Sequence, residues 1–148
     1  KNQLPFIILR LFQIYGPFQK FDRLIPQIIR SSLKNKNFKC TNGNQFRDYL
    51  YIDDFTNLIK KIMKKKRIKS NIFNVGYGKP IKVRDVIEKI TRIIKKGKPN
   101  YGSIKMRKDE ILNLYPDTKK VKKFFNWAPK ISINIGLKKT IRHYNEIL

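Results

Sequence analysis

The sequence holds few of the residues from which metal centres and hydrolytic active sites are built. Among 148 residues there is one cysteine, Cys40, and one histidine, His143. A single cysteine excludes a disulfide framework within the chain and a cysteine-based zinc site. A single histidine gives little support to a histidine metal cluster or to a Ser/His/Asp triad. We therefore expect no metal site.

Long apolar runs are also missing. No run approaches the roughly 20 residues that a membrane-spanning helix needs, and no small-residue cleavage site follows the apolar stretch 1–15. We therefore predict no membrane partner, no signal peptide and a cytoplasmic location. Apolar residues make up 41% of the chain, which is enough for a packed core. Because the chain begins at Lys1 without an initiator methionine, we interpret residues 1–148 as a single partial domain of a longer protein.

Acidic residues are scarce beside basic ones. Ten Asp and Glu residues stand against 35 Lys and Arg residues, which gives a net charge of +25 at pH 7. Such a charge is typical of proteins that bind a polyanion such as nucleic acid. The alternative is a solvated surface on which lysine fills exposed helix positions. We favour this alternative because lysines outnumber arginines, whereas proteins that recognise bases and phosphates rely on arginine. The basic clusters at 64–67 and 119–123 are then expected at helix ends and outer faces.

The spacing of apolar residues predicts a mixed α/β chain. A buried strand is expected over 4–12, followed by a turn at Tyr15-Gly16-Pro17. Shorter extended segments are expected over 38–41, 49–52 and 72–76. Residues 99–115 lack a clear period and are expected to be mostly loop with a short strand.

Five helices are predicted where apolar residues recur at helical spacing. Asp22, either Asp53 or Asp54, and Asp117 are the expected capping residues of three of them. The last helix is expected to start near Ser132 and to face inward through Ile135, Leu137, Ile141 and Tyr144. The predicted ranges are 22–33, 53–63, 83–96, 117–126 and 132–148.

A glycine-rich turn between a strand and a helix, the usual cradle for a dinucleotide, is missing from the sequence. The nearest approach is Gly76-Tyr77-Gly78, but Lys79-Pro80 follows where the fingerprint needs its third glycine. We interpret residues 76–78 as a turn that precedes the helix expected from residue 83.

Six blocks of sequence, in one order and at plausible spacings, resemble a single family. They are L-R-L-F-Q-I-Y-G-P (9–17), L-I-P (24–26), G-N-Q-F-R-D-Y-L-Y-I-D-D (43–54), F-N-V-G-Y-G (73–78), R-K-D (107–109), and N-W-A-P (126–129) with the closing helix G-L-K-K-T-I (136–141). Together they resemble the C-terminal half of the extended short-chain dehydrogenase/reductases, which include the NAD-dependent epimerases and dehydratases of nucleotide sugars. The resemblance covers essentially the whole chain.

This resemblance implies both a fold and a function. The fold would be the α/β substrate-binding lobe of such an enzyme, without the N-terminal Rossmann core that mainly binds NAD. The family's catalytic Tyr-x-x-x-Lys pair would lie upstream, so we assign no catalytic residue and expect the isolated chain to be inactive. The lobe would bind a nucleotide-diphosphate sugar for an NAD-dependent epimerase or dehydratase that is a homodimer at full length. The alternatives are a fragment of an NAD(P)-dependent deoxysugar-nucleotide reductase or synthase, a catalytically silent binding lobe, and a basic nucleic-acid-binding domain.

The resemblance also implies which residues hold the diphosphate and ribose. Arg47 and Arg107 fall where the family's diphosphate-binding arginines lie, and a guanidinium fork suits a group with about two negative charges. Asp109 is similar to the acid that accepts the ribose hydroxyls. The alternatives are a salt bridge from Arg47 to Asp48 or Asp53, and ordinary loop charges at positions 107 and 109.

Five further residues are assigned through the same resemblance. Gln13 stands where the family has an asparagine near the diphosphate, and it offers the same amide one methylene further out. Leu24 and Pro26 resemble a loop that covers the base, although plain packing explains them equally well. Leu11 and Phe12 end a strand that passes the cofactor's nicotinamide in the family, with simple burial as the favoured alternative.

Overall fold

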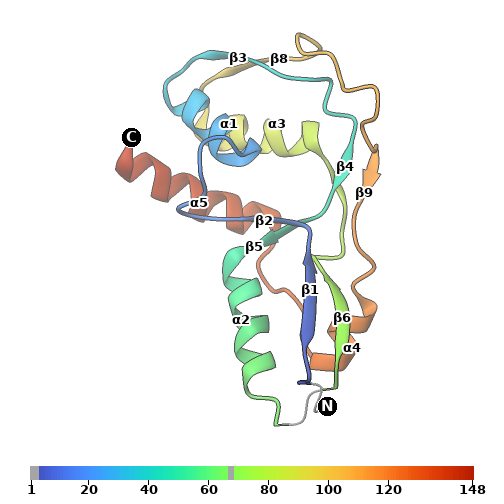
Figure 1. Cartoon of the computed structure of the whole chain (residues 1–148). Coiled ribbons are helices and arrows are strands. Elements are labelled where there is room, and N and C mark those ends of the chain that lie inside the picture. The colour runs from blue at the N-terminus through green and yellow to red at the C-terminus, as the bar shows by residue number, and fades with distance from the viewer. Residues whose placement is uncertain (1–3, 67–68) are drawn as a thin grey trace.

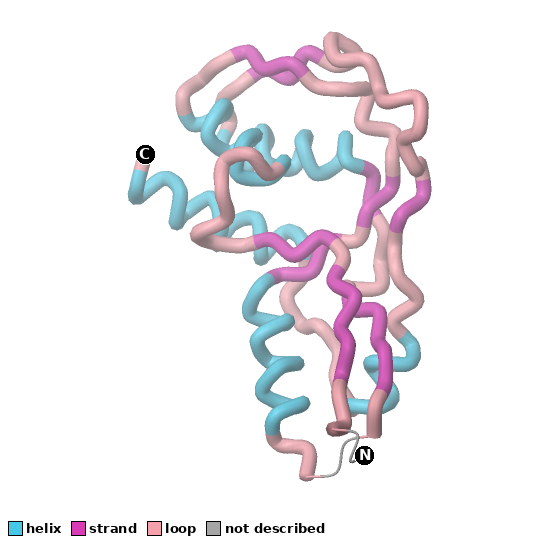
Figure 2. The backbone as a smooth tube through the Cα atoms, viewed as in Figure 1, coloured by secondary structure: helices cyan, strands magenta, loops and turns pink. Residues whose placement is uncertain are grey.

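The computed structural model describes residues 4–66 and 69–148, and within them the chain is mixed α/β, as predicted (Figure 1). The strands are short and the loops between them are long (Figure 2). The strands are β1 Ile7–Leu11, β2 Gln13–Tyr15, β3 Asn37–Lys39, β4 Phe46–Arg47, β5 Tyr49–Tyr51, β6 Asn71–Val75, β7 Ile81–Lys82, β8 Lys98–Asn100 and β9 Asn113–Leu114. The helices are α1 Leu24–Leu33, α2 Ile52–Met63, α3 Val83–Ile94, α4 Lys119–Phe125 and α5 Ile133–Ile147.

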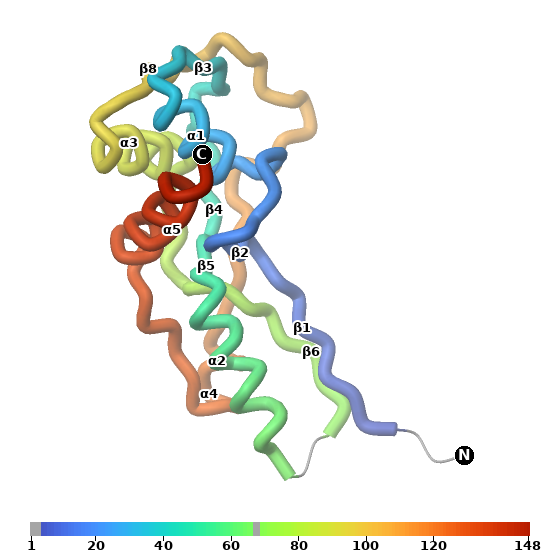
Figure 3. The backbone as a smooth tube through the Cα atoms, turned by 90° about the vertical axis from the view of Figure 1, so that its left-hand side faces the viewer, coloured from blue at the N-terminus to red at the C-terminus, as the bar shows by residue number. Residues whose placement is uncertain are grey.

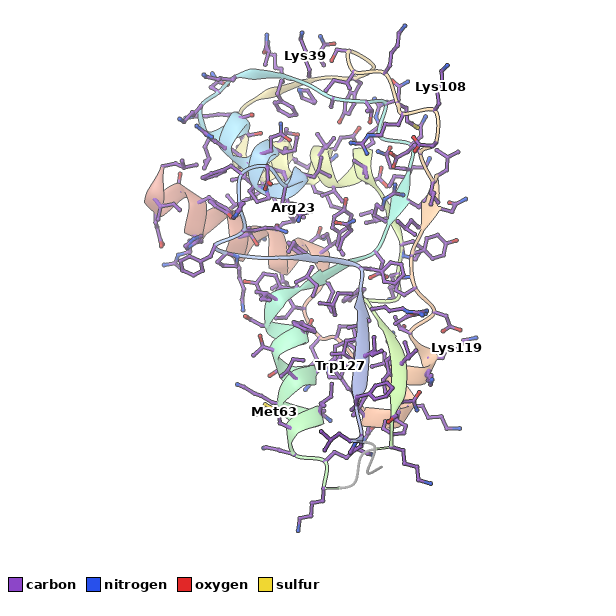
Figure 4. The ribbon with its side chains drawn as sticks, viewed as in Figure 1. Arg23, Lys39, Met63, Lys108, Lys119 and Trp127 are labelled. Atoms are coloured by element: carbon purple, nitrogen blue, oxygen red, sulfur yellow. The ribbon has the colours of Figure 1, made fainter. Side chains whose placement is uncertain are left out.

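The lower part of the molecule is a two-stranded parallel sheet with helices on one face. β1 pairs with β6 in register, from Ile7 opposite Asn71 to Leu11 opposite Val75. Because side chains alternate across a strand, only every second residue of each strand faces α2 and α4. Trp127 lies between α2 and this sheet (Figure 4). The buried core here consists of Leu50, Leu58, Phe73, Val75, Val121, Phe125 and Trp127.

The opposite face of this sheet has no covering layer among the described residues. Ile8 and Ile72 are 45% and 39% exposed, and Phe6 is about as open. Parallel sheets are normally covered on both faces. The prediction of one buried strand over 4–12 is therefore wrong in two respects. The strand β1 covers only residues 7–11, and it is partly exposed because nothing packs on its outer face.

The upper part of the molecule is built from α1, α3 and α5, which pack on one another around a larger core. β3 and β8 pair in parallel above these helices. β2 and β5, also parallel, form the junction between the two parts, and α5 lies beside this junction in both views (Figures 1 and 3). The largest fully buried aliphatic and aromatic side chains of this core are Ile29, Val86, Ile87, Ile90, Leu137 and Tyr144.

The helix ends follow the predicted caps only in part. Asp117 accepts the N–H of Lys119 at 2.8 Å, although the N-cap position of α4 is Thr118. Ser132, the expected start of the last helix, caps α5 by accepting the N–H of Ile135. Asp53 and Asp54 are not caps, because α2 already begins at Ile52 and both aspartates lie in its first turn.

Three smaller predictions are also wrong. The residue that caps α1 is Arg23 rather than Asp22. Helix α3 ends at Ile94, and its C-cap is Lys95, whose φ of 59° is in the left-handed region, two residues before the expected Gly97. Ile135 is 51% exposed, because the inward face of α5 is the one that carries Leu137, Ile141 and Tyr144.

Within the described residues, no helix is long and apolar enough to cross a lipid bilayer. The same residues contain no cluster of three or more His, Cys, Asp or Glu side chains that could hold a metal ion.

Candidate functional site

Two adjoining hollows lie where β2, α1 and β4 meet. The β2 hollow has a volume of about 520 Å³ and is lined by Gln19, Lys20, Tyr49 and residues 11–15 and 22–25. The β4 hollow has a volume of about 310 Å³. Its lining is Gln13, Leu24, Gln27, Ile28, Lys39, Cys40, Thr41, Gln45, Arg47, Tyr49, Val83, Ile87, Ile104 and Glu110. Gln13, Leu24 and Tyr49 line both hollows, so we treat the two neighbouring hollows as one candidate site.

Several of the residues assigned from sequence meet in this site. Leu11, Phe12, Gln13 and Leu24 line the β2 hollow. Gln13 and Leu24 also line the β4 hollow, where they join Arg47. Residues 34 positions apart in sequence meet because β2 pairs in parallel with β5, which places Gln13 opposite Tyr49, two residues beyond Arg47.

Three assigned residues do not reach the two hollows in this structure. Pro26 is buried in the first turn of α1 and lines neither hollow. Arg107 and Asp109 are exposed and lie in a turn on the segment between β8 and β9. Their neighbour Glu110 does line the β4 hollow.

The Arg47 guanidinium has an internal carboxylate partner. Its Nη2 is ion-paired with Glu110, and its Nη1 donates to the carbonyl oxygens of Phe46 at 2.8 Å and Leu112 at 3.4 Å. The predicted alternative of a bridge to Asp48 or Asp53 is therefore not what forms. Asp48 binds backbone amides instead, and Asp53 pairs with Lys139 on α5.

Asp48 stands next to Arg47 in sequence but has a structural role. Its fully buried carboxylate accepts the backbone N–H groups of Tyr77, of Gly78 at 2.6 Å and of Lys79 at 3.0 Å. The turn predicted over 76–78 is confirmed, and this aspartate is what holds it against β5. Gly78 has a φ of 86°, a conformation that favours glycine.

Asp54 plays a matching role at the other end of the same sequence block. Its buried carboxylate accepts the N–H groups of Lys130 at 3.0 Å and Ile131 at 2.9 Å, in the segment that leads into α5. Asp48 and Asp54 of the block 43–54 therefore tie two distant loops to β5 and α2.

Tyr49 also lines both hollows, although no sequence pattern assigned it to the site. It is 7% exposed, and burial raises the pKa of its phenol well above the usual value, while Arg47 opposes that rise. Tyr49 is therefore a neutral hydroxyl group over the whole physiological range. Its ring meets Tyr15 edge to face at 6.2 Å between ring centroids. The available signal was the spacing of Arg47 and Tyr49, two residues apart in an extended segment.

Cys40, Lys39 and Glu110 were also missed as lining residues. Burial raises the pKa of the Cys40 thiol, and Arg84 only partly offsets this effect. Cys40 is therefore a protonated, unreactive wall residue near neutral pH. No sequence motif singled out these three residues, because the segments that carry them meet only in the folded chain.

The basic clusters lie at helix ends, as predicted. Lys64 ends α2, and Lys122 and Lys123 lie in the last turn of α4; Arg67 of the first cluster is outside the described residues. Lys119 and Lys108 point outward in Figure 4. The ammonium group of Lys65 lies 4.5 Å from the ring centroid of Phe124, so part of the basic surface covers aromatic side chains.

Comparison with known proteins gives one consistent match. The profile of the NAD-dependent epimerase/dehydratase family matches residues 1–76. The chain is 36% identical over 142 residues to a CDP-abequose synthase of Salmonella muenchen, covering 92% of this chain and 47% of that protein. It is also 36% identical over 142 residues to a UDP-glucuronate 4-epimerase of Thermodesulfobacterium geofontis, covering 94% of this chain and 43% of that protein.

Solved structures agree with the sequence match. The UDP-glucuronic acid 4-epimerase of Bacillus cereus, in complex with UDP-glucuronic acid and NAD, superposes with a TM-score of 0.89 at 26% identity. That match covers 98% of this chain and 46% of the epimerase. The chain thus spans just under half the length of the relatives it matches, and it corresponds to their C-terminal part.

Proposed function

The chain belongs to the NAD-dependent epimerase/dehydratase family, and on that premise we propose that it is the nucleotide-sugar-binding part of such an enzyme. One observation carries the proposal: Arg47 lines the β4 hollow together with Gln13 and Leu24. A guanidinium, an amide and an apolar side chain suit a diphosphate, a neighbouring polar group and the face of a base respectively. The relatives named for UDP, CDP and dTDP sugars support this ligand class.

The residues present fit only one end of NAD. Leu11 is the last residue of β1, at the carboxyl end of a parallel pair, where ligands of α/β sheets bind. With Phe12 it offers an apolar wall for a nicotinamide ring, but the sequence has no glycine-rich turn to hold the dinucleotide phosphates. When bound, NAD would take a hydride from the sugar and return it. The role of this chain would be to hold the substrate beside it.

We propose three further features of the complete protein. Residues 1–148 would be one partial domain, the full-length enzyme would be a homodimer, and it would be cytoplasmic. Sedimentation of a protein that carries both halves, and cell fractionation, test the last two. A monomer or a membrane-bound pool would contradict them.

The test of the proposed function is binding without turnover. The chain is titrated by calorimetry with UDP-glucose, CDP-glucose and dTDP-glucose, and then incubated with each sugar and NAD. We expect saturable binding of at least one nucleotide sugar and no product above a protein-free control. Product formation would show that this chain alone is an enzyme. Absence of binding to all three, together with salt-dependent binding of duplex or single-stranded DNA, would favour the nucleic-acid alternative.

A further inference from the structure

The loop between β2 and α1, residues 16–23, forms one wall of the β2 hollow. Gln19, Lys20, Asp22 and Arg23 of this loop line the hollow. Lys20 and Arg23 bring two positive charges to it, against the one negative charge of Asp22. A wall with an excess of positive charge suits the anionic ligand that the proposed function assigns to this site. The position of the loop therefore decides where these charges lie.

The backbone of this loop contains a strained residue. Phe18 has a φ of 62°, in the left-handed region, which is unfavourable for a bulky side chain. Its side chain is 87% exposed, so the residue is not held by a core around it. Its ring lies against His143 of α5, with 4.3 Å between the ring centroids. Because such a conformation persists only where the surrounding structure imposes it, the loop depends on contacts from elsewhere in the fold.

The main contact comes from α5, near the other end of the chain. The phenol of Tyr144 donates a hydrogen bond to the backbone carbonyl oxygen of Gln19, across 125 residues of sequence. Tyr144 is 1% exposed, and its ring centroid lies 5.2 Å from that of Phe21 in the same loop. A buried hydroxyl group that loses its partner is costly. The folded α5 therefore holds the loop at Gln19.

Gln19 is also attached to the strand beside it. Its side-chain Nε2 donates to the carbonyl oxygen of Ile14 in β2 at 3.0 Å. The next residue, Lys20, accepts the N–H of Arg23 at 3.1 Å through its own carbonyl oxygen. A displacement of Gln19 from Tyr144 therefore moves the turn 20–23 as well.

We propose that Tyr144 is a positioning residue for the candidate site. From the last helix it holds Gln19, and through the turn 20–23 it sets the positions of Lys20 and Arg23 in the wall of the β2 hollow. Tyr144 itself lines neither hollow, so it acts only through this loop. The inference rests on the proposed function in one respect, because it takes the ligand of the hollow to be a nucleotide-diphosphate sugar.

The first test measures the loop directly, through the rate of trypsin cleavage after Lys20, with the cut sites identified by mass spectrometry. Tyr144→Phe keeps the ring and removes only the donor. We expect it to speed this cleavage roughly three- to tenfold relative to cleavage after Lys105, an exposed residue of another loop. Thr140→Val is the matched control, because it also removes a buried hydroxyl from α5, but one that donates to Gly136 within the helix.

The ratio of the two cleavage rates separates positioning from general stability. A residue that merely stabilises the fold would expose both sites together when it is replaced, and the ratio would stay as in the wild type. We expect that result for Thr140→Val. The same result for Tyr144→Phe would overturn the inference.

The second test measures the consequence for binding by calorimetric titration. The probe is UDP-glucose, CDP-glucose or dTDP-glucose, whichever the wild type binds most tightly. Tyr144→Phe should bind it roughly three- to tenfold more weakly than the wild type, and Thr140→Val should bind it as the wild type does. Faster cleavage after Lys20 without a loss of affinity would overturn the positioning role. If no nucleotide sugar binds even to the wild type, the proposed function fails, and the cleavage ratio still decides whether Tyr144 holds the loop.

Discussion

Asp48 Oδ2 accepts the backbone N–H of Gly78 at 2.6 Å, across 30 residues of sequence. The same carboxylate binds the N–H groups of Tyr77 and Lys79. The aspartate next to Arg47 therefore supports the β6–β7 turn.

Asp48→Asn should destabilise the fold, although Asp48 lines neither hollow of the candidate site. The amide keeps the size of the carboxylate but turns an NH₂ group towards backbone donors, so at least one buried N–H loses its acceptor. We expect a loss on the order of 2–3 kcal/mol in the free energy of unfolding, measured by urea denaturation. Asp117→Asn is the control, because Asp117 is exposed and accepts only the N–H of Lys119. Equal losses for the two variants would contradict the supporting role of Asp48.

Gly136→Ala should be destabilising although alanine is the better helix former. A Cβ at Gly136 would lie 2.1 Å from the Tyr15 hydroxyl oxygen, so the ring would have to move. We expect a cost of about 1–3 kcal/mol from overpacking, which exceeds the gain in helix propensity of roughly 1 kcal/mol. Tyr15→Phe should restore part of the loss in the double variant. Asn134→Ala, at an exposed position of the same helix, should change stability little; a stable Gly136→Ala protein would refute the contact.

Stability should fall as pH rises above about 10 through the buried tyrosines. Burial raises the pKa of Tyr49 above its usual value near 10, so the unfolded chain loses this proton first. The unfolded state then holds fewer protons than the folded state, which makes the slope of stability against pH negative. Tyr49→Phe should remove up to about 1.4 kcal/mol per pH unit of that slope. Tyr115→Phe, at a position 46% exposed, should leave the slope unchanged, and parallel slopes for all three proteins would disprove the assignment.

The uncovered face of the β1–β6 sheet should make the isolated chain self-associate. Ile8 and Ile72 are exposed on an apolar surface of the kind that favours aggregation. Replacing both by threonine should lower association in sedimentation velocity, because threonine keeps the β-branched shape and adds a hydroxyl. The melting temperature should change little, since neither side chain packs in a core. A wild-type chain that melts sharply as a clean monomer would show that this face needs no cover.

Arg47 should contribute more to nucleotide-sugar binding than the lysine cluster. We expect Arg47→Ala to lose roughly ten- to a hundredfold in affinity, or about 1.5–3 kcal/mol. Neutralising Lys64, Lys65 and Lys66 together changes only a screened surface field and should have a small effect at physiological salt. Calorimetric titration at one fixed salt concentration compares them. A larger loss in the triple lysine variant would mean that the basic surface binds the ligand.

Asp109→Ala should distinguish binding of a nucleotide from binding of its phosphates alone, because we propose that Asp109 accepts ribose hydroxyls. The variant should weaken binding of a nucleoside diphosphate and leave inorganic pyrophosphate nearly unaffected. Parallel titrations with UDP and pyrophosphate measure the difference. Equal losses for both ligands would show that Asp109 acts on the phosphates or on the fold.

Local patterns in the sequence were sufficient for the helices, for the longer strands and for part of the site. Helical spacing located the five helices of the described residues, because apolar side chains on one face of a helix indicate which face is buried. The short strands β2, β4 and β7 were not predicted. The order of the six blocks placed Arg47, Gln13 and Leu24 in one candidate site, and the structure brings them to one hollow. The turn at 76–78 followed from its glycines and from Lys79-Pro80.

Tertiary structure decided which acid meets which partner and which residues remain apart. Asp48, Asp53 and Asp54 look alike in sequence, yet each binds a different segment because β5 and α2 point them in different directions. Arg47 meets Glu110 only because β4 pairs with β9, 66 or more residues away. That same pairing leaves Arg107 and Asp109 at the surface. Contacts of this kind depend on the path of the whole chain, whereas sequence patterns report only what lies within a few residues.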